Sequence, residues 1–244
     1  MKKENERINF NNITDDDIER WNTEIRDFNQ IHIEDDELKN ADPALKYKID
    51  EISNYLLMRA SQMEKQITND LHDLLSGGAY FVELEHRFKS KKRLMDKIYS
   101  KVISNFEDPL QVGKKVADTL RYTIIFDFDT YIEQVDDYLT SLEEMGYKVI
   151  KFKNRWGEVY YKGINVHVED EEHRKFEIQF HTKENYDIKE IFSREPYNLI
   201  RSSNVPNELL IKAHLLRRIY QKRVHIPENA LSYQYESKSK KRSR

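Results

Sequence analysis

The chain has 244 residues, a formal net charge of −3 and 35% charged residues, so a large solvated surface surrounds a modest core. It contains no cysteine, which excludes disulfides, thiolate metal sites and a cysteine nucleophile. No apolar run approaches the roughly 18 residues of a membrane span, and residues 1–6 lack the apolar stretch of a signal peptide. We therefore expect a cytoplasmic protein without a membrane partner.

The N-terminal part is expected to be helical. Three aspartates after Thr14 predict a helix start, because acidic residues are favourable near the positive end of the helix dipole. Pro43 then opens a long run of apolar residues at helical spacing, which ends at the Ser-Gly-Gly sequence of residues 76–78. A further helix is predicted over 94–104, where apolar residues recur every four positions.

The middle of the chain changes to a strand-like pattern. Residues that favour strands predict four of them, over 120–128, 147–152, 163–168 and 175–181, with a helix over 131–145 and a turn at 154–157. After His181 helices follow, which we expect Pro196 and Pro206 to interrupt. The order predicts an α+β fold: a mixed β-sheet of about five strands flanked by helices, with helical N-terminal and C-terminal segments.

Charge and composition suggest three segments outside the strand-rich middle of the chain. We expect an acidic, mainly helical segment over 1–79, a basic helical segment over 202–236 and a disordered basic tail over 237–244. The acidic and basic blocks are two solvated faces or, alternatively, mark a C-terminal half that binds nucleotide phosphates or RNA. The dinucleotide, P-loop and zincin motifs do not occur.

A basic cluster at 86–101 is the first candidate site. Arg93 and Lys97 lie four residues apart and share a helix face, where like charges repel unless an anion covers them. A triphosphate relieves that repulsion, and Arg87 and Lys89 precede the helix as further phosphate ligands. The alternative is an ordinary solvated basic helix.

Two carboxylates on neighbouring strands form the second candidate site. Asp118, followed by Arg121, enters the first predicted strand, and Glu177 alternates with Gln179 and His181 along the last. Such a pair suits Mg²⁺, which prefers one or two carboxylates with phosphate oxygens and water, and a carboxylate beside it can act as a general base. The alternative for Glu177 is one half of a cross-strand ion pair.

The segment 160–165 is the third candidate. Tyr161 and Lys162 precede a glycine and Asn165, and this combination lets a flat base stack while the backbone approaches it closely. An ordinary hairpin edge is the alternative.

These segments together resemble the RelA/SpoT-type alarmone synthetase family. The resemblance covers roughly residues 80–201 and rests on HRFKSKKRLMDK, ADTLRYTIIF, YYKGIN and FEIQFHT, which occur in the family's order. It implies a nucleotidyltransferase-like fold, ATP as the pyrophosphate donor and Mg²⁺ as the cofactor. It also implies roles for single residues: contacts to ATP from Arg87, Lys89 and Lys97, magnesium held by Asp118 and Glu177, and the acceptor base bound by Tyr161 with Gln179 nearby.

Departures from the family pattern indicate its divergent toxin and effector branch. Arg121 comes early in its strand, Asn165 replaces a common histidine and Arg93 replaces a common serine. Lys189, Glu190, Tyr197 and Arg201 fit a tail pattern of that branch.

The resemblance implies that the protein transfers pyrophosphate from ATP to the 3′-hydroxyl of an adenosine or guanosine nucleotide (ADP/ATP or GDP/GTP). A growth-inhibiting toxin with a neutralising antitoxin or immunity protein is the expected setting. Two alternatives stay open: the same chemistry on the 3′ end of tRNA, and a nucleotide- or RNA-binding module without catalysis.

Overall fold

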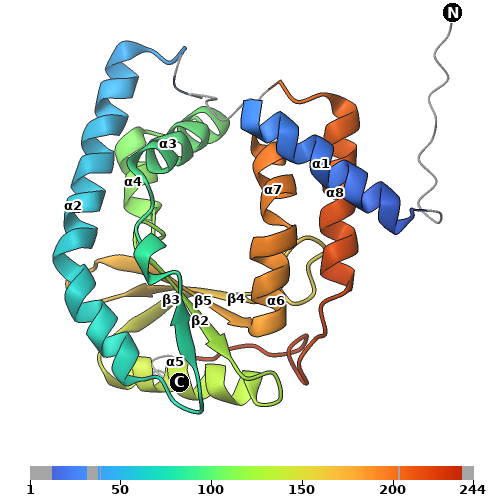
Figure 1. Ribbon diagram of the computed structural model, residues 1–244. Helices are drawn as coiled ribbons and strands as arrows, with labels where there is room; N and C mark the ends of the chain where they lie inside the picture. Colours follow the sequence, from blue (N-terminus) through green and yellow to red (C-terminus); the bar gives the residue numbers. More distant parts are fainter. Residues whose placement is uncertain (1–12, 32–37, 39, 203, 238–244) are drawn as a thin grey trace, which may run out of the picture. The chain divides into compact units, whose positions relative to one another are not determined.

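A computed structural model describes residues 13–31, 38, 40–202 and 204–237 (Figure 1). Contacts divide the chain into a helical unit, residues 1–35 and 188–223, and a sheet unit, residues 36–187 and 224–244, each within the described ranges. The segment predicted over 1–79 is shared between the two units. Of the tail predicted to be disordered, residues 238–244 lie outside the described residues.

The sheet unit contains a five-stranded mixed sheet in the order β1-β2-β5-β4-β3, which confirms the predicted α+β class. Strands β2 and β5 are parallel and the other neighbours are antiparallel. The three-residue strand β1 was not predicted. The strands are β1 (Tyr80–Val82), β2 (Arg121–Phe126), β3 (Lys148–Asn154), β4 (Ile164–Glu169) and β5 (Lys175–Thr182).

One face of this sheet is apolar and covered by helices. Helix α5 (Tyr131–Glu144) places Tyr138 edge-on against Phe126 and Phe180, with ring centroids 5.9 and 5.6 Å apart. The C-terminal half of α2 (Pro43–Asp73) joins it, because the Tyr138 hydroxyl donates to the Leu71 carbonyl at 2.9 Å. In Figure 1, α5 runs beneath the sheet. The opposite face carries the polar side chains of the strands.

The N-terminal half of α2 packs against α3 (Lys91–Asn105) and α4 (Pro109–Lys115) through a buried apolar cluster that includes Ile49, Leu94 and Val112. Helix α3 begins earlier than predicted because the Ser90 side chain accepts from a backbone N–H of its first turn. Helix α4 was not predicted. Two short helices complete the unit, the 3₁₀-helix η1 (Leu84–His86) and α6 (Lys183–Asp187).

The helical unit packs α1 (Asp15–Ile31), α7 (Arg194–Arg201), α8 (Asn207–Lys222) and the π-helical turn η2 (Ile188–Phe192) around Trp21, Ile25 and Leu216. The helices after His181 are interrupted as expected. One break lies at Ser193, so that Pro196 falls in the first turn of α7, where its missing N–H needs no partner. The other separates α7 from α8, which begins directly after Pro206. Among the described residues, no helix is both long and apolar enough to cross a bilayer.

Candidate functional site

The polar face of the sheet brings β2, β5 and β4 together. Arg121 lies beside Glu177 in the parallel pair, and Thr123 lies beside Gln179, which is flanked on its other side by Asn165. Because side chains alternate along a strand, these residues point away from the face that α5 covers. The alternation predicted for β5 is visible in a hydrogen bond of 3.3 Å from the Gln179 amide to Glu177 Oε2.

Asp118 stands at the entrance to β2 and holds two lysines. Lys89 Nζ lies 2.8 Å from Oδ2, and Lys97 Nζ lies 2.6 Å from Oδ1. The backbone supports this geometry, since the Lys89 N–H donates to the Thr119 carbonyl at 2.9 Å. The segment before α3, the middle of α3 and the start of β2 therefore converge on one carboxylate.

The electrostatics of this cluster favour an anionic ligand. Burial opposes ionisation of Asp118, but Lys89 and Lys97 outweigh it and lower the pKa of the carboxyl to about 2. Burial also lowers the pKa of Lys89, and the nearby charges of Lys97 and Arg121 act in the same direction against Asp118. The lowered pKa of Asp118 reflects a gain from the ion pairs, whereas the lowered pKa of Lys89 reflects the cost of burying its charge. The ion pairs therefore stabilise the fold by less than the pKa of Asp118 alone implies. Two lysines on one carboxylate, with the charge of Arg121 acting on Lys89, suit a phosphate chain.

Glu177 is buried, with 8% of its surface exposed, and amide groups hold it. Asn165 Nδ2 donates to Oε1 at 3.0 Å, opposite the bond from Gln179. Within the described part of the chain, no cation lies within 4.0 Å of this carboxylate, so a direct ion pair does not neutralise it. Its charge is oriented by two amides and stays available to a metal ion or a proton.

Tyr161, His181 and Asn185 form a hydrogen-bonded series at the end of this face where β5 passes into α6. The Asn185 amide nitrogen donates to the Lys162 carbonyl at 3.0 Å and lies 2.8 Å from His181 Nδ1. Nδ1 must therefore accept, which places the proton of a neutral imidazole on Nε2. Nε2 lies 3.0 Å from the Tyr161 hydroxyl and donates to it. These hydrogen bonds connect the half-buried Tyr161, through His181, to the buried Asn185 of α6, and so hold the tyrosine ring in place.

Three of the predicted residues have other contacts. Arg87 Nε pairs with Glu64 of α2 at 2.7 Å, and Arg93 is exposed on α3. Lys162 is buried and donates to the carbonyls of Trp156 and Glu158, both at 2.9 Å, which closes the loop before β4. Lys162 therefore supports the loop that carries Tyr161.

Four residues at the site were missed from the sequence. Lys151 lies beside His167 and Lys153 beside Asn165, so β3 adds two cations to the polar face. Burial lowers the pKa of His167, although Glu177 and Asp118 oppose the shift. The alternation of β3 was a usable signal for the lysines. Nothing in the sequence singles out Asn185, the fourth.

Magnesium is the cofactor that the resemblance implies. Among the residues that the structure describes, no three His, Cys, Asp or Glu side chains gather into a metal site. Arg121, three residues after Asp118, lies beside Glu177, so the two carboxylates share one region of the face, and both charges oppose the lowering of the His167 pKa by burial. Asn165 Oδ1 is buried beside Glu177 without a hydrogen-bond partner in the described region. Two carboxylates and an amide oxygen fit a metal ion that also binds phosphate.

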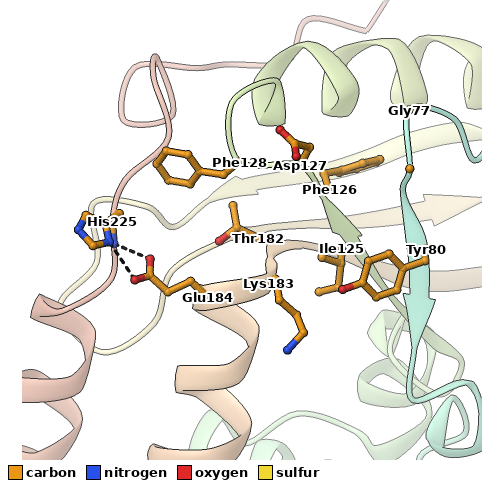
Figure 2. A pocket seen from close by; sticks show the side chains of 11 residues that line it. Gly77, Tyr80, Ile125, Phe126, Asp127, Phe128, Thr182, Lys183, Glu184 and His225 are labelled. Atoms are coloured by element: carbon orange, nitrogen blue, oxygen red, sulfur yellow. Dashed lines mark hydrogen bonds and ion pairs between the residues drawn. The ribbon is translucent and has the colours of Figure 1, made fainter.

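A cavity of about 510 Å³ lies at the carboxyl ends of β2 and β5 (Figure 2). Tyr80 and Phe128 line it with Thr182, and a hydrogen bond of 2.8 Å between Glu184 and His225 closes one side. None of the predicted site residues lines this cavity. The candidate site is instead the polar face that contains Asp118 and Glu177.

The chain is similar in structure to three solved proteins. A GTP pyrophosphokinase family protein from Streptococcus pneumoniae shares 16% identity, with a TM-score of 0.42, over 82% of this chain and 88% of its own. The type VI effector Tas1, solved with its immunity protein, shares 16% over 75% and 97%, with a TM-score of 0.41. The protein smu.1046c from Streptococcus mutans shares 17% over 74% and 88%, also at 0.41. Neither a family model nor a curated protein matches the sequence.

Proposed function

We propose that this protein is a pyrophosphokinase, which transfers the β,γ-diphosphate of ATP to the 3′-hydroxyl of a purine nucleotide. The supporting observation is the convergence of Lys89 and Lys97 on Asp118, next to the strand pair that carries Arg121 and Glu177. It combines phosphate-binding cations with a buried carboxylate on a single polar face. The quoted family motifs supply the reaction class that these groups serve.

The donor side of the proposal uses the lysines. Each ammonium has three N–H donors, so Lys89 and Lys97 can keep a bond to Asp118 and still bind phosphate oxygens. Arg87 completes this side, and its pairing with Glu64 orients the guanidinium through Nε. Arg93 extends the donor side along α3. Magnesium held by Asp118 and Glu177 supplies charge neutralisation of the phosphates when bound.

The reaction is an in-line displacement. A bond forms between the acceptor 3′-oxygen and the β-phosphorus, and the bond from that phosphorus to the oxygen bridging the α-phosphate breaks, so AMP leaves. Glu177 accepts the hydroxyl proton, for which its amide-held orientation prepares it. The cations stabilise the charge that develops on the phosphate oxygens.

The acceptor side uses Tyr161 as a stacking platform. Its hydroxyl is held by His181 at 3.0 Å, and the ring stands edge-on to the imidazole. Gln179 and Asn165 lie beside each other on neighbouring strands and offer polar contacts to the acceptor. Lys162 keeps the loop in place. Adenosine and guanosine nucleotides both suit this arrangement, since stacking does not discriminate between purines.

The resemblance to the toxin and effector branch also suggests a role for the protein in the cell. We infer a growth-inhibiting activity in the cytoplasm of the affected cell, with an antitoxin or immunity protein as partner. Inducible expression tests this: growth arrest that disappears with Glu177→Gln supports a toxin, and harmless expression of an active enzyme contradicts it.

The activity is tested with purified full-length protein and ATP labelled on the γ-phosphate. Separate reactions contain adenosine nucleotides, guanosine nucleotides or bulk tRNA, each with Mg²⁺ or with a chelator. Label transferred to a nucleotide supports the proposal, whereas label on tRNA alone replaces it with tRNA pyrophosphorylation. Glu177→Gln should reduce transfer by about 10²–10⁴-fold, while the exposed Glu133→Gln control retains it. Nucleotide binding without transfer, indifferent to Mg²⁺, favours a binding module.

A further inference from the structure

A second cavity, of about 670 Å³, lies in the sheet unit between α2, α4 and the turn that joins β4 to β5. Its buried lining is apolar and includes Ile52, Ala60, Met63 and Val116. The volume falls within the range of pockets that hold small organic ligands, about 300–1,000 Å³. No residue proposed for catalysis lines it.

The more exposed lining carries uncompensated positive charge from Arg59, Lys114 and Lys175. Arg59 donates to neutral acceptors, the Tyr55 hydroxyl at 3.4 Å and the Glu172 carbonyl at 3.3 Å. Lys175 Nζ donates to the Lys114 carbonyl at 3.0 Å. Within the described ranges, none of the three cations has a carboxylate within 4.0 Å. Unpaired cations beside an apolar surface favour an anionic group there.

Two other charged residues line the cavity. Arg174 is paired, with Asp170 at 2.6 Å and with the Glu172 carboxylate at 3.2 Å. Glu51 is hydrogen-bonded to the neutral Tyr47 hydroxyl, whose pKa this contact raises, so the bond does not compensate a carboxylate charge. The three cations therefore outnumber this one carboxylate, and the lining has an excess of positive charge.

Thr119 adds a polar atom at the buried end. It is 4% exposed and lines the cavity, and its Oγ1 has no hydrogen-bond partner among the described residues. A buried hydroxyl without a partner is unfavourable, because it has lost its hydrogen bonds to water. A ligand atom that bonds this hydroxyl removes that cost.

We propose that this cavity binds an amphipathic organic anion. The apolar body lies against Ile52, Ala60 and Met63, the acidic group meets Arg59, Lys114 and Lys175, and a polar atom reaches Thr119. The site is separate from the polar face, so the inference does not depend on pyrophosphate transfer.

Two fluorescent probes of one shape test the inference with the full chain. One is 8-anilinonaphthalene-1-sulfonate, which carries an anionic group, and the other is N-phenyl-1-naphthylamine, which has nearly the same body without the charge. We expect one saturable site per chain that binds the sulfonate more tightly. Arg59→Gln and Lys114→Gln should each weaken sulfonate binding by roughly threefold and leave the neutral probe unchanged.

The two control variants lie on α2, the helix that carries Arg59. Lys65→Gln, an exposed lysine outside the cavity, should change neither affinity. Ala60→Leu places a larger side chain in the apolar part of the cavity and should weaken binding of both probes, with thermal unfolding confirming that the variant folds. Equal affinities for the two probes, unchanged sulfonate binding in Arg59→Gln and Lys114→Gln, or unchanged binding of both probes in a folded Ala60→Leu variant overturns the inference.

Discussion

The close approach of Gly163 to His181 gives the most quantitative prediction. Gly163 has φ +127°, and a Cβ atom there would lie 2.9 Å from His181 Cε1 and 3.0 Å from the Phe180 carbonyl oxygen. His181 cannot retreat, because it is fully buried and bonded on both nitrogens, to Tyr161 and Asn185. Gly163→Ala therefore combines backbone strain with a steric clash.

Two other glycines separate these two costs. Gly78 has φ +80° but open space around its Cβ position, so Gly78→Ala carries backbone strain alone. Gly157 has no atom within 4 Å of that position and no positive φ, so Gly157→Ala carries neither cost. We expect Gly157→Ala to stay within about 0.5 kcal/mol of wild type and Gly78→Ala to lose about 1 kcal/mol. Gly163→Ala should lose about 2–6 kcal/mol, the sum of backbone strain and overpacking.

The assay is thermal unfolding followed by Trp156 fluorescence in a Trp21→Phe background, which leaves one tryptophan in the chain, in the sheet unit. Trp156 is fully buried and next to Arg155, whose N–H donates to the Gly163 carbonyl. The loss for Gly163→Ala corresponds to a Tm lower by about 5–20 °C. If Gly163→Ala melts no lower than Gly78→Ala, the loop does not pack against His181 as described.

Three further predictions concern the charged and hydrogen-bonded groups of the site. Asp118→Asn should lower the free energy of unfolding near pH 7 by up to about 2 kcal/mol, and denaturant titrations should show this deficit shrinking as pH falls from about 4 to 2. The deficit shrinks in acid because the pKa of Asp118 is lower in the native state than in the unfolded state, so protonation removes the stabilisation that the asparagine lacks. A deficit that grows as the pH falls contradicts this reasoning. Asn185→Asp should move the His181 proton from Nε2 to Nδ1, because a carboxylate accepts where the amide donates, and ¹⁵N NMR of labelled histidine measures the tautomer. An unchanged tautomer refutes the hydrogen bond from Asn185 to His181. Lys97→Gln should weaken binding of a non-hydrolysable ATP analogue roughly tenfold in calorimetry, and exposed Arg93→Gln less than threefold; equal losses refute the Asp118 cluster as phosphate site.

The sheet was predictable because local periodicity determines which face each strand residue occupies. The alternation of Glu177 and Gln179 with Phe180 was sufficient to predict a polar and an apolar face. Helix α4 carried a usable signal that was missed: Asp108 caps it and Pro109 occupies its first turn. Strand β1 has only three residues, so it has no period to detect.

Contacts between distant segments were not predictable. Asn185 resembles any polar residue of a short helix, and its role depends on His181 and on the Lys162 carbonyl, which lies 23 positions earlier. Likewise, α1 joins α7 and α8 across more than 160 residues, as in the 2.6 Å bond from Asn29 to Glu195. A single sequence carries no signal for such pairings.

The charge balance of the site bears on the order in which ligands bind. Lys89, Lys97 and Arg121, together with Lys151 and Lys153 of β3, outnumber Asp118 and Glu177, so this face has three excess positive charges. A free Mg²⁺ ion would be repelled by the lysines that already occupy both Asp118 oxygens. A magnesium–triphosphate complex is an anion, and its phosphate oxygens would accept from the N–H groups of Lys89 and Lys97 that Asp118 does not use. Under the proposed function, the lysines of Asp118 would therefore favour binding of the metal as a nucleotide complex over binding of the free ion.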